Sequence, residues 1–287
     1  MVSSRYRTLL CAVLLAGPAC TVAAAPATEA LIKERIGKLP ELPDAKRPAA
    51  IAQLATDIRG LPAGQGKVKL ADSLAHASTA GETGAEALQA VADALAQSLT
   101  ETPQAAKNDN PAEPYVELAK LARYDRTSTD LKDPQLAKAD EILAADDADR
   151  QKADFTLGDM NGKKYTLSAL RGKIVLVNFW ETTCGPCRIE MVNLDLIYTH
   201  YQSQGLIMLS ITDEPSNSVV QFIQHTRNNY SPPILIDAGG KVAKLFHLDG
   251  LPRAFVFDRE GKLVAQSIDM RTQAQFFDML AKGGLHP

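Results

Sequence analysis

Two cysteines three residues apart, Cys184 and Cys187, are the residues of this sequence whose types and spacing could do chemistry. They stand in the motif Cys-Gly-Pro-Cys, which begins shortly after the apolar run KIVLVNFW. Such a pair can alternate between dithiol and disulfide, because one thiolate attacks a disulfide in a partner and the second thiol then displaces that partner. The motif therefore predicts thiol–disulfide exchange.

The elements around the pair are predicted to hold the two sulfurs differently. The apolar run is typical of a buried central strand, and a helix is predicted to follow it. Cys184 then lies at the strand-to-helix junction, where unpaired backbone N–H groups and the positive end of the helix favour a thiolate over a thiol. We expect Cys184 to be the nucleophile and Cys187 to be the more buried, resolving thiol. The side chains that recur at helical spacing are Cys187, Met191, Leu194, Tyr198 and Tyr201.

Three residues near the cysteines have predicted roles of their own. Gly185 leaves room for a substrate backbone, and Pro186 is tolerated because N–H groups of a first helical turn lack partners anyway. Glu190 follows Cys187 by three residues on the inward face, where burial would raise the pKa of its carboxyl toward neutral. It could then accept the proton of Cys187. The alternative is a glutamate on the protein surface, stabilised there by the helix dipole.

The other two cysteines, Cys11 and Cys20, lie in a predicted secretory signal over residues 1–25. Arg5 and Arg7 precede an apolar run, and small residues follow it, so we expect cleavage between about residues 24 and 27. An uncleaved anchor and lipid attachment at Cys20 are the alternatives. The exported chain would keep one close cysteine pair and no structural disulfide framework.

The remaining sequence predicts two kinds of structure. Residues 26–105 are rich in Ala and Leu and are expected to form about four short helices. Residues 106–150 are interpreted as a linker followed by a helix that Asp133 caps and that ends near Ala148. In residues 151–287, short strands alternate with helices and end in an antiparallel hairpin, which predicts an α/β fold with a mixed sheet.

The stretch ADFTLGDMNGKKYTLSALRGKIVLVNFWETTCGPCRIEM, followed by GLPRAFVFDREGKLV, resembles the exported thioredoxin-like thiol–disulfide oxidoreductases of the TlpA and ResA type. The resemblance covers residues 151–287 and implies a thioredoxin-like fold, a nucleophilic first cysteine and a resolving second one. It also implies an acidic residue at the position of Glu190, whereas cytoplasmic thioredoxins bury an Asp at the position of Asn178.

The same resemblance implies a cis-proline at Pro252 that faces the dithiol, with the backbone of Leu251 receiving the substrate chain. We therefore expect the substrate to be bound by Trp180, Gly185, Pro186, Leu251 and Pro252. Two departures from the family pattern are Thr183, where Trp is usual, and Arg253, where Thr is common. Arg253 could favour the Cys184 thiolate, bind an acidic substrate, or be an exposed loop residue.

The sequence was compared with the residues that three other functions would require. A zinc site needs four ligands, and the five histidines are scattered, although His247 could give a copper-type Cys2His site. A peroxidase would need Thr or Ser and Pro at the positions of Glu181 and Val177. A pure interaction module would not need both cysteines together with Trp180 and Leu251-Pro252. We expect no metal and no cofactor.

The sequence thus predicts an exported protein-disulfide oxidoreductase, periplasmic or extracytoplasmic, with a membrane tether as an alternative. Cys-Gly-Pro-Cys is the motif of reducing thioredoxins, so we expect a reductant, with a disulfide oxidase or isomerase as the alternative. By resemblance, a membrane donor supplies its electrons. A net charge of −3 argues against a nucleic-acid partner. The helical N-terminal region either binds an unknown partner or spaces the catalytic part from the membrane.

Overall fold

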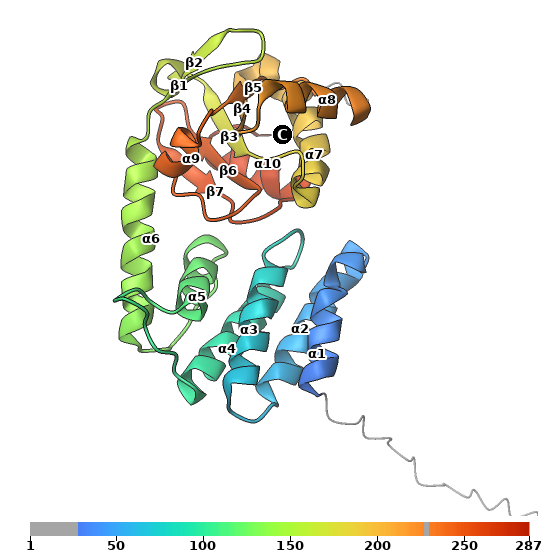
Figure 1. Cartoon of the computed structure of the whole chain (residues 1–287), viewed down its shortest axis with the longest axis vertical. Coiled ribbons are helices and arrows are strands. Elements are labelled where there is room, and N and C mark those ends of the chain that lie inside the picture. The colour runs from blue at the N-terminus through green and yellow to red at the C-terminus, as the bar shows by residue number, and fades with distance from the viewer. Residues whose placement is uncertain (1–27, 227–229, 287) are drawn as a thin grey trace, which may run out of the picture.

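The computed structural model describes residues 28–226 and 230–286 (Figure 1). The predicted signal segment, residues 1–25 with Cys11 and Cys20, lies outside the described residues. Within those two ranges, no helix combines the length and the apolar character that crossing a membrane requires.

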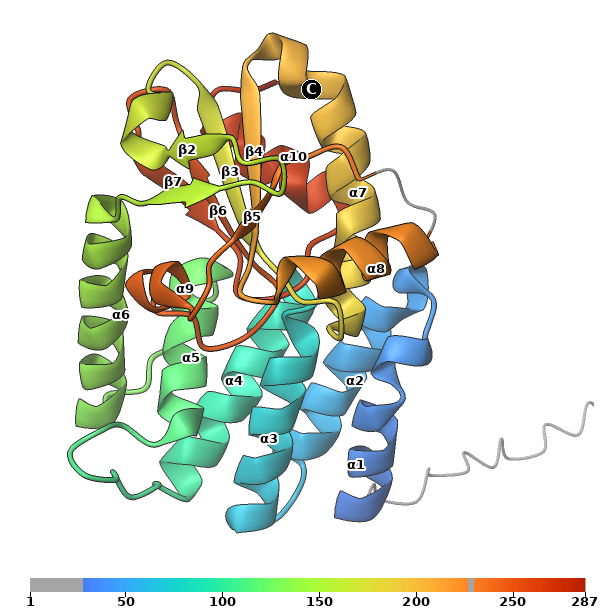
Figure 2. The same ribbon diagram turned by 45° about the horizontal axis from the view of Figure 1, so that its top comes forward.

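The first described region is a layer of helices that lie side by side (Figures 1 and 2). Its residues 29–101 form four helices, as predicted, because Pro and Gly interrupt the apolar periodicity between them. Their inward side chains, such as Ile32, Leu54, Leu74 and Leu95, form one buried core. The four are α1 (Glu29–Gly37), α2 (Arg47–Arg59), α3 (Gln65–Ser78) and α4 (Ala85–Glu101), with short 3-10 turns at Leu39–Glu41 and Asp44–Lys46.

The segment predicted as a linker contains a further helix, α5 (Glu113–Tyr124). Tyr115, Leu118 and Leu121 from α5 are buried in the same core as α1 to α4, so α5 belongs to the helical layer. The helix α6 (Pro134–Lys152) begins where it was predicted, since the Asp133 side chain accepts a hydrogen bond from the Gln135 backbone at 2.8 Å. It continues to Lys152 rather than ending near Ala148.

The second region is built on a five-stranded sheet in the order β5-β4-β3-β6-β7. Strands β3, β4 and β5 are parallel to one another. Strand β6 pairs antiparallel with β3, and β7 pairs antiparallel with β6, which confirms the predicted mixed sheet. A two-stranded hairpin, β1 (Thr156–Gly158) and β2 (Lys164–Thr166), and a 3-10 turn, Leu167–Leu170, precede it. The other elements are β3 (Ile174–Phe179), α7 (Gly185–Tyr201), the 3-10 turn Gln202–Gln204, β4 (Leu206–Thr212), α8 (Ser216–Thr226), β5 (Ile234–Ile236), α9 (Lys241–Leu245), β6 (Arg253–Phe257), β7 (Leu263–Gln266) and α10 (Gln273–Lys282).

Strand β3 is the central strand of this sheet, and all six of its residues are buried. Successive side chains of a strand point to opposite faces. Ile174 and Leu176 pack with residues of α7 and α10 on one face. Val175 and Val177 pack with α9 and with residues of the β1–β2 hairpin on the other. This two-sided burial fixes the strand from whose end the Cys-Gly-Pro-Cys motif emerges.

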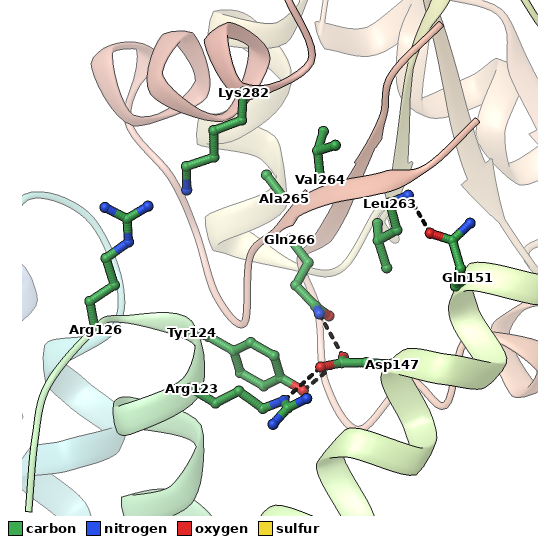
Figure 3. A pocket seen from close by; sticks show the side chains of 10 residues that line it. All are labelled: Arg123, Tyr124, Arg126, Asp147, Gln151, Leu263, Val264, Ala265, Gln266 and Lys282. Atoms are coloured by element: carbon green, nitrogen blue, oxygen red, sulfur yellow. Dashed lines mark hydrogen bonds and ion pairs between the residues drawn. The ribbon is translucent and has the colours of Figure 1, made fainter. Parts of the chain in front are cut away.

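Helix α6 runs alongside both regions and is attached to the sheet at its C-terminal end (Figure 1). The buried Arg150 donates from Nε to the Phe246 carbonyl at 2.9 Å. Gln266 on β7 donates to Asp147 at 2.7 Å, and the Leu263 backbone N–H donates to Gln151 at 2.8 Å (Figure 3). Side-chain hydrogen bonds thus join α6 to the edge strand of the sheet.

Candidate active site

Cys184 is the N-cap residue of α7, at the junction predicted from the sequence. Its Sγ accepts a hydrogen bond from the Cys187 backbone N–H at 3.2 Å. The structure holds the pair as a disulfide, with the two Cα atoms 5.3 Å apart. In the reduced protein the same N–H group and the positive end of α7 would favour a thiolate on Cys184.

The two sulfurs differ in exposure, as the helical spacing predicted. Cys187 is 1 % exposed, whereas Cys184 is partly exposed beside Gly185. Among the described residues outside its own helix backbone and its chain neighbours, no atom lies within 4 Å of a Cβ placed on Gly185, so a substrate chain has space there. A disulfide in another protein can therefore reach Cys184 but not Cys187.

Glu190 is the buried carboxyl of the site, 1 % exposed and one helical turn after Cys187. The prediction of an inward-facing Glu190 is confirmed, and the alternative of a glutamate on the surface is wrong. Asn178 donates from Nδ2 to Oε2 at 3.1 Å, and the Arg271 backbone N–H donates to Oε1 at 2.9 Å. Both carboxyl oxygens therefore have a fixed partner.

Burial raises the pKa of Glu190 to about 8. The Arg271 backbone N–H, the positive charge of Arg271 and the Asn178 amide lower this pKa, and Asp269 raises it, but the loss of hydration is the largest effect. Near neutral pH the carboxyl can therefore both take up and release a proton, which suits a group that exchanges protons with a thiol.

This pKa predicts how the stability of the oxidised protein depends on pH. Between about 4.5 and 8, Glu190 ionises in the unfolded chain but stays protonated in the folded one, so stability is lost as pH rises through this window. A shift of this size corresponds to a loss on the order of 5 kcal/mol. Urea unfolding of the wild type and of Glu190→Gln at a series of pH values measures it. The difference between the two unfolding free energies should change across the window and be constant above it; a difference independent of pH contradicts the buried carboxyl.

An apolar cluster lies around the disulfide and includes Trp180, Cys187, Met191, Val219 and Ile234. Trp180 is 1 % exposed, and its ring packs against Phe222 with centroids 5.8 Å apart. Its indole thus supports Cys187 from within the protein. Direct contact of Trp180 with a substrate, which the sequence predicted, stays a prediction, although Trp180 also lines a pocket of about 200 Å³ together with Gly250 and Leu251.

The loop before β6 brings Leu251 to the Cys184–Cys187 disulfide. The Leu251–Pro252 peptide bond is cis, Pro252 is buried, and the half-buried Leu251 packs against the cluster that contains both cysteines. The structure thus brings together Cys184, Cys187, Glu190, Trp180, Gly185, Pro186 and the Leu251–Pro252 loop.

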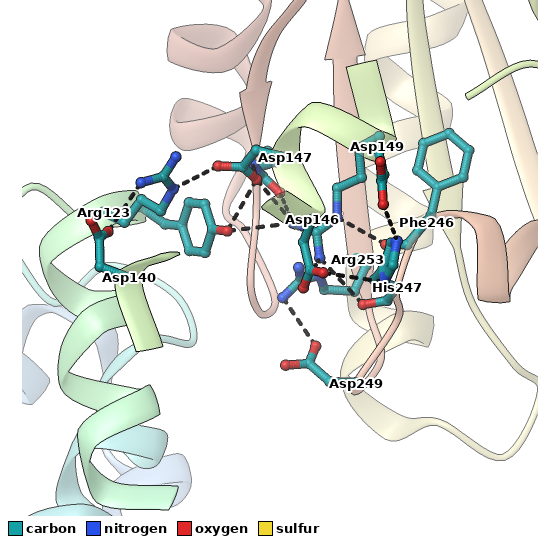
Figure 4. Close-up of polar contacts among 12 residues, drawn as sticks. Arg123, Asp140, Asp146, Asp147, Asp149, Phe246, His247, Asp249 and Arg253 are labelled. Carbon is teal, nitrogen blue, oxygen red and sulfur yellow. Dashed lines mark hydrogen bonds and ion pairs between the residues drawn. The ribbon is translucent and has the colours of Figure 1, made fainter. Parts of the chain in front are cut away.

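Arg253 does not take the exposed position that was considered for it. It is the first residue of β6, paired with Phe179 of β3, and is 2 % exposed. Its guanidinium lies 3.3 Å from the Asp249 carboxylate (Figure 4) and over the Phe255 ring. A buried side chain of this kind fixes the loop that carries Leu251 and is not available to bind an acidic substrate.

His247 does not form the copper-type site with the two cysteines that was considered from the sequence, because its ring faces helix α6. Its ring nitrogens face two carboxylates of α6, Asp146 at 3.2 Å and Asp149 at 3.4 Å (Figure 4). Among the described residues, one group could present three metal-ligating atoms within 4.8 Å of one another: His76, Glu113 and Glu117, on α3 and α5 of the helical layer.

Comparison with known proteins adds to this geometry. Residues 149–266 match the model of the AhpC/TSA family. The thiol-disulfide oxidoreductase ResA of Bacillus anthracis is 33 % identical over 134 residues, which are 76 % of that protein and 46 % of this chain. The chain belongs to the ResA family of thiol-disulfide oxidoreductases. The ResA protein of Geobacillus thermodenitrificans is 37 % identical over 111 residues, 63 % of that protein and 38 % of this chain.

Solved structures similar to this ResA-family enzyme match a similar share of the chain. A thiol:disulfide interchange protein from Chlorobium tepidum is 24 % identical, with a TM-score of 0.41, and covers 45 % of this chain and 92 % of its own. StoA from Bacillus subtilis is 20 % identical, with a TM-score of 0.40, and covers 45 % of this chain and 96 % of its own. The mixed sheet flanked by helices is a thioredoxin-like fold.

One residue of the site was not predicted from the sequence. Arg271 follows Glu190 by 81 residues in the chain and donates to its carboxylate. The Arg271 side chain in turn donates to Asp125, which precedes Arg271 by 146 residues. No local pattern links these positions, since the loop before α10 carries neither a motif nor a periodicity of its own. The contact between Arg271 and Asp125 depends on how the helical layer docks against the ResA-family part.

Proposed function

We propose that this ResA-family enzyme is exported and reduces protein disulfides through a Cys184–Cys187 dithiol, with Glu190 as the proton acceptor for Cys187. The observation that carries the proposal is the buried Glu190 carboxyl one helical turn after the buried Cys187. A buried thiol has no water to take its proton, so the second half of the reaction needs a protein base.

The first step is attack by the Cys184 thiolate on one sulfur of the substrate disulfide. The substrate S–S bond breaks, the far sulfur leaves as a thiolate that takes a proton from solvent, and a mixed disulfide forms. The partly exposed Cys184, the open space at Gly185 and the exposed Pro186 support an approach from this side. In this proposal Leu251 and Pro252 bind the substrate chain next to the mixed disulfide.

The second step releases the substrate. Glu190 takes the proton of Cys187, and the resulting thiolate attacks the Cys184 sulfur. The second substrate sulfur then leaves as a thiolate and is protonated. Two electrons have moved from the enzyme dithiol to the substrate, and the Cys184–Cys187 disulfide of the structure is the product. An external dithiol must then return two electrons, and we propose that a membrane protein supplies it.

The direction of the reaction is tested by the reduction potential of the Cys184/Cys187 couple. For a reductant we expect a value near that of thioredoxin, about −270 mV. Equilibration with thiol redox buffers, followed by alkylation and mass spectrometry of the two cysteines, measures it. A potential above about −180 mV would make the enzyme an oxidase or isomerase instead.

Export rests on the sequence of residues 1–25, where Arg5 and Arg7 precede an apolar run and small residues. The test is the N-terminal residue of the protein recovered from the extracytoplasmic fraction, which should lie close to position 26. Recovery of an intact chain with the soluble cytoplasmic proteins would argue against export.

A further inference from the structure

Arg271, in the loop between β7 and α10, links the helical layer to Glu190. This residue is 7 % exposed, and its backbone and its side chain contact different parts of the protein. Its backbone N–H donates to Oε1 of Glu190 at 2.9 Å. Its side chain leaves the thioredoxin-like part and enters the helical layer. The position of one hydrogen-bond donor to Glu190 is therefore tied to residues outside the thioredoxin-like fold.

The helical layer binds the Arg271 guanidinium at the C-terminal ends of two helices. Nη1 donates to the carbonyl of Thr79, the C-cap residue of α3, at 2.9 Å. Nη2 donates to the carboxylate of Asp125, the C-cap residue of α5, at 2.9 Å. The negative ends of two helix dipoles favour a cation at this point. The side chains of Arg271 and Asp125 are 8 % and 6 % exposed, so water screens their ion pair little.

Residues next to Arg271 and the first turn of α10 are held by the loop between α3 and α4. The Gly81 backbone N–H donates to the Met270 carbonyl at 2.9 Å, and Gln275 donates to the Gly81 carbonyl at 3.0 Å. Thr272 donates to Glu82 at 2.5 Å. Gly81 has a φ of +75°, a conformation that favours glycine and lets the two backbones meet.

We propose that the helical layer is a positioning element of the active site, and that Arg271 is the positioning residue through which it holds the Glu190 carboxyl. This proposal rests on the proposed function, because it assumes that Glu190 accepts the proton of Cys187. It gives the helical layer a role in the second step of the reaction and none in the first, since Cys184 is placed by β3 and α7.

The charges around Glu190 determine the direction of the expected effect. Arg271 lowers the pKa of Glu190 through its backbone N–H and its positive charge, against the larger effect of burial. If the guanidinium lost its anchor, the N–H would move and the carboxyl would hold its proton to higher pH. The polar and titratable groups near this carboxyl are Asn178 from β3, Cys187 from α7, Asp269 and Arg271 from the β7–α10 loop, and Tyr230, which is hydrogen-bonded to Ser210 of β4.

The test uses Asp125→Asn, because Asp125 touches Arg271 but not the dithiol, and the substitution keeps the size of the side chain. The reduced protein is mixed with oxidised glutathione, quenched at intervals, alkylated and analysed by mass spectrometry, so that attack by Cys184 and release by Cys187 are timed separately. We expect release at pH 7 to slow about tenfold and the midpoint of its pH profile to rise by about one unit, with attack unchanged. Arg271→Met should have a larger effect in the same direction.

The matched control is Glu101→Gln, which changes another carboxylate of the helical layer, the one paired with the buried Lys67 at 2.8 Å. We expect its pH midpoint to equal that of the wild type. In a Glu190→Gln background, Asp125→Asn should cause no further change in the release step, because its effect passes through Glu190.

The outcomes separate this proposal from the proposed function. If Glu190→Gln does not slow release, the role of Glu190 itself is wrong, and the present proposal is wrong with it. If Glu190→Gln slows release but Asp125→Asn and Arg271→Met keep the wild-type midpoint, only the role of the helical layer is overturned. Equal slowing of attack and release without a change in midpoint also overturns it, because that result indicates general loss of structure.

Discussion

Replacing Cys184 with Ser will abolish disulfide reduction, because it removes the one sulfur of the dithiol that a substrate can reach. Cys184 is partly exposed at the N-terminus of α7, whereas Cys187 is 1 % exposed and cannot take its place. A Ser hydroxyl at this position is a far poorer nucleophile than a thiolate. Turnover of insulin as a disulfide substrate should fall to the rate without enzyme.

The matched control is Thr183→Ser at the neighbouring, exposed position, which should keep nearly the wild-type rate. Circular dichroism of Cys184→Ser verifies that the fold is intact. Residual turnover well above background in a folded Cys184→Ser protein would mean that another group attacks the substrate.

Replacing Glu190 with Gln will slow the release of substrate by about a hundredfold, the lower range for loss of a general base. The amide keeps the shape of the carboxyl and can still accept from the Arg271 backbone N–H, but it cannot accept the proton of Cys187. The wild-type release rate should rise with pH as Glu190 ionises around pH 8, because only the ionised carboxyl can take that proton. The variant should lack this rise and accumulate mixed disulfide.

Rapid quenching and mass spectrometry with oxidised glutathione measure both steps in the same sample. The first step should be nearly unchanged in Glu190→Gln, since Cys184 owes its reactivity to the end of α7. Asn178→Ala offers a comparison, because it removes one donor to Glu190 but leaves the carboxyl in place, and it should slow release much less. Equal effects of Glu190→Gln on attack and on release would contradict the assignment.

The parts of the site that depend on local sequence were predicted well. Strand β3, helix α7 and the unequal burial of Cys184 and Cys187 follow from an apolar run and a helical spacing. The burial of Glu190 was one of two alternatives, because spacing places a residue on a face of the helix but does not show what covers that face. The sheet decides it, since Asn178 of β3 meets Glu190 directly.

The errors in the prediction have physical causes. Helix α5 was missed because the residues from 106 to the helix capped by Asp133 were interpreted as a linker, although Pro114 stands in the first turn of α5, where proline is tolerated. An exposed loop position was one of the alternatives considered for Arg253, because arginine is mostly exposed in proteins, but Arg253 begins strand β6 and is buried. The Arg271–Asp125 pair depends on the packing of two regions far apart in sequence, which residue patterns do not encode.

The central claim is that Cys184 attacks the substrate and Cys187 releases it. Its most direct test is to mix reduced Cys187→Ser with insulin and locate the trapped mixed disulfide by mass spectrometry of peptides. The account predicts a stable adduct on Cys184 and its disappearance on addition of a dithiol. A reduced, folded Cys187→Ser protein that forms no adduct on Cys184, or that continues to turn over, would contradict it.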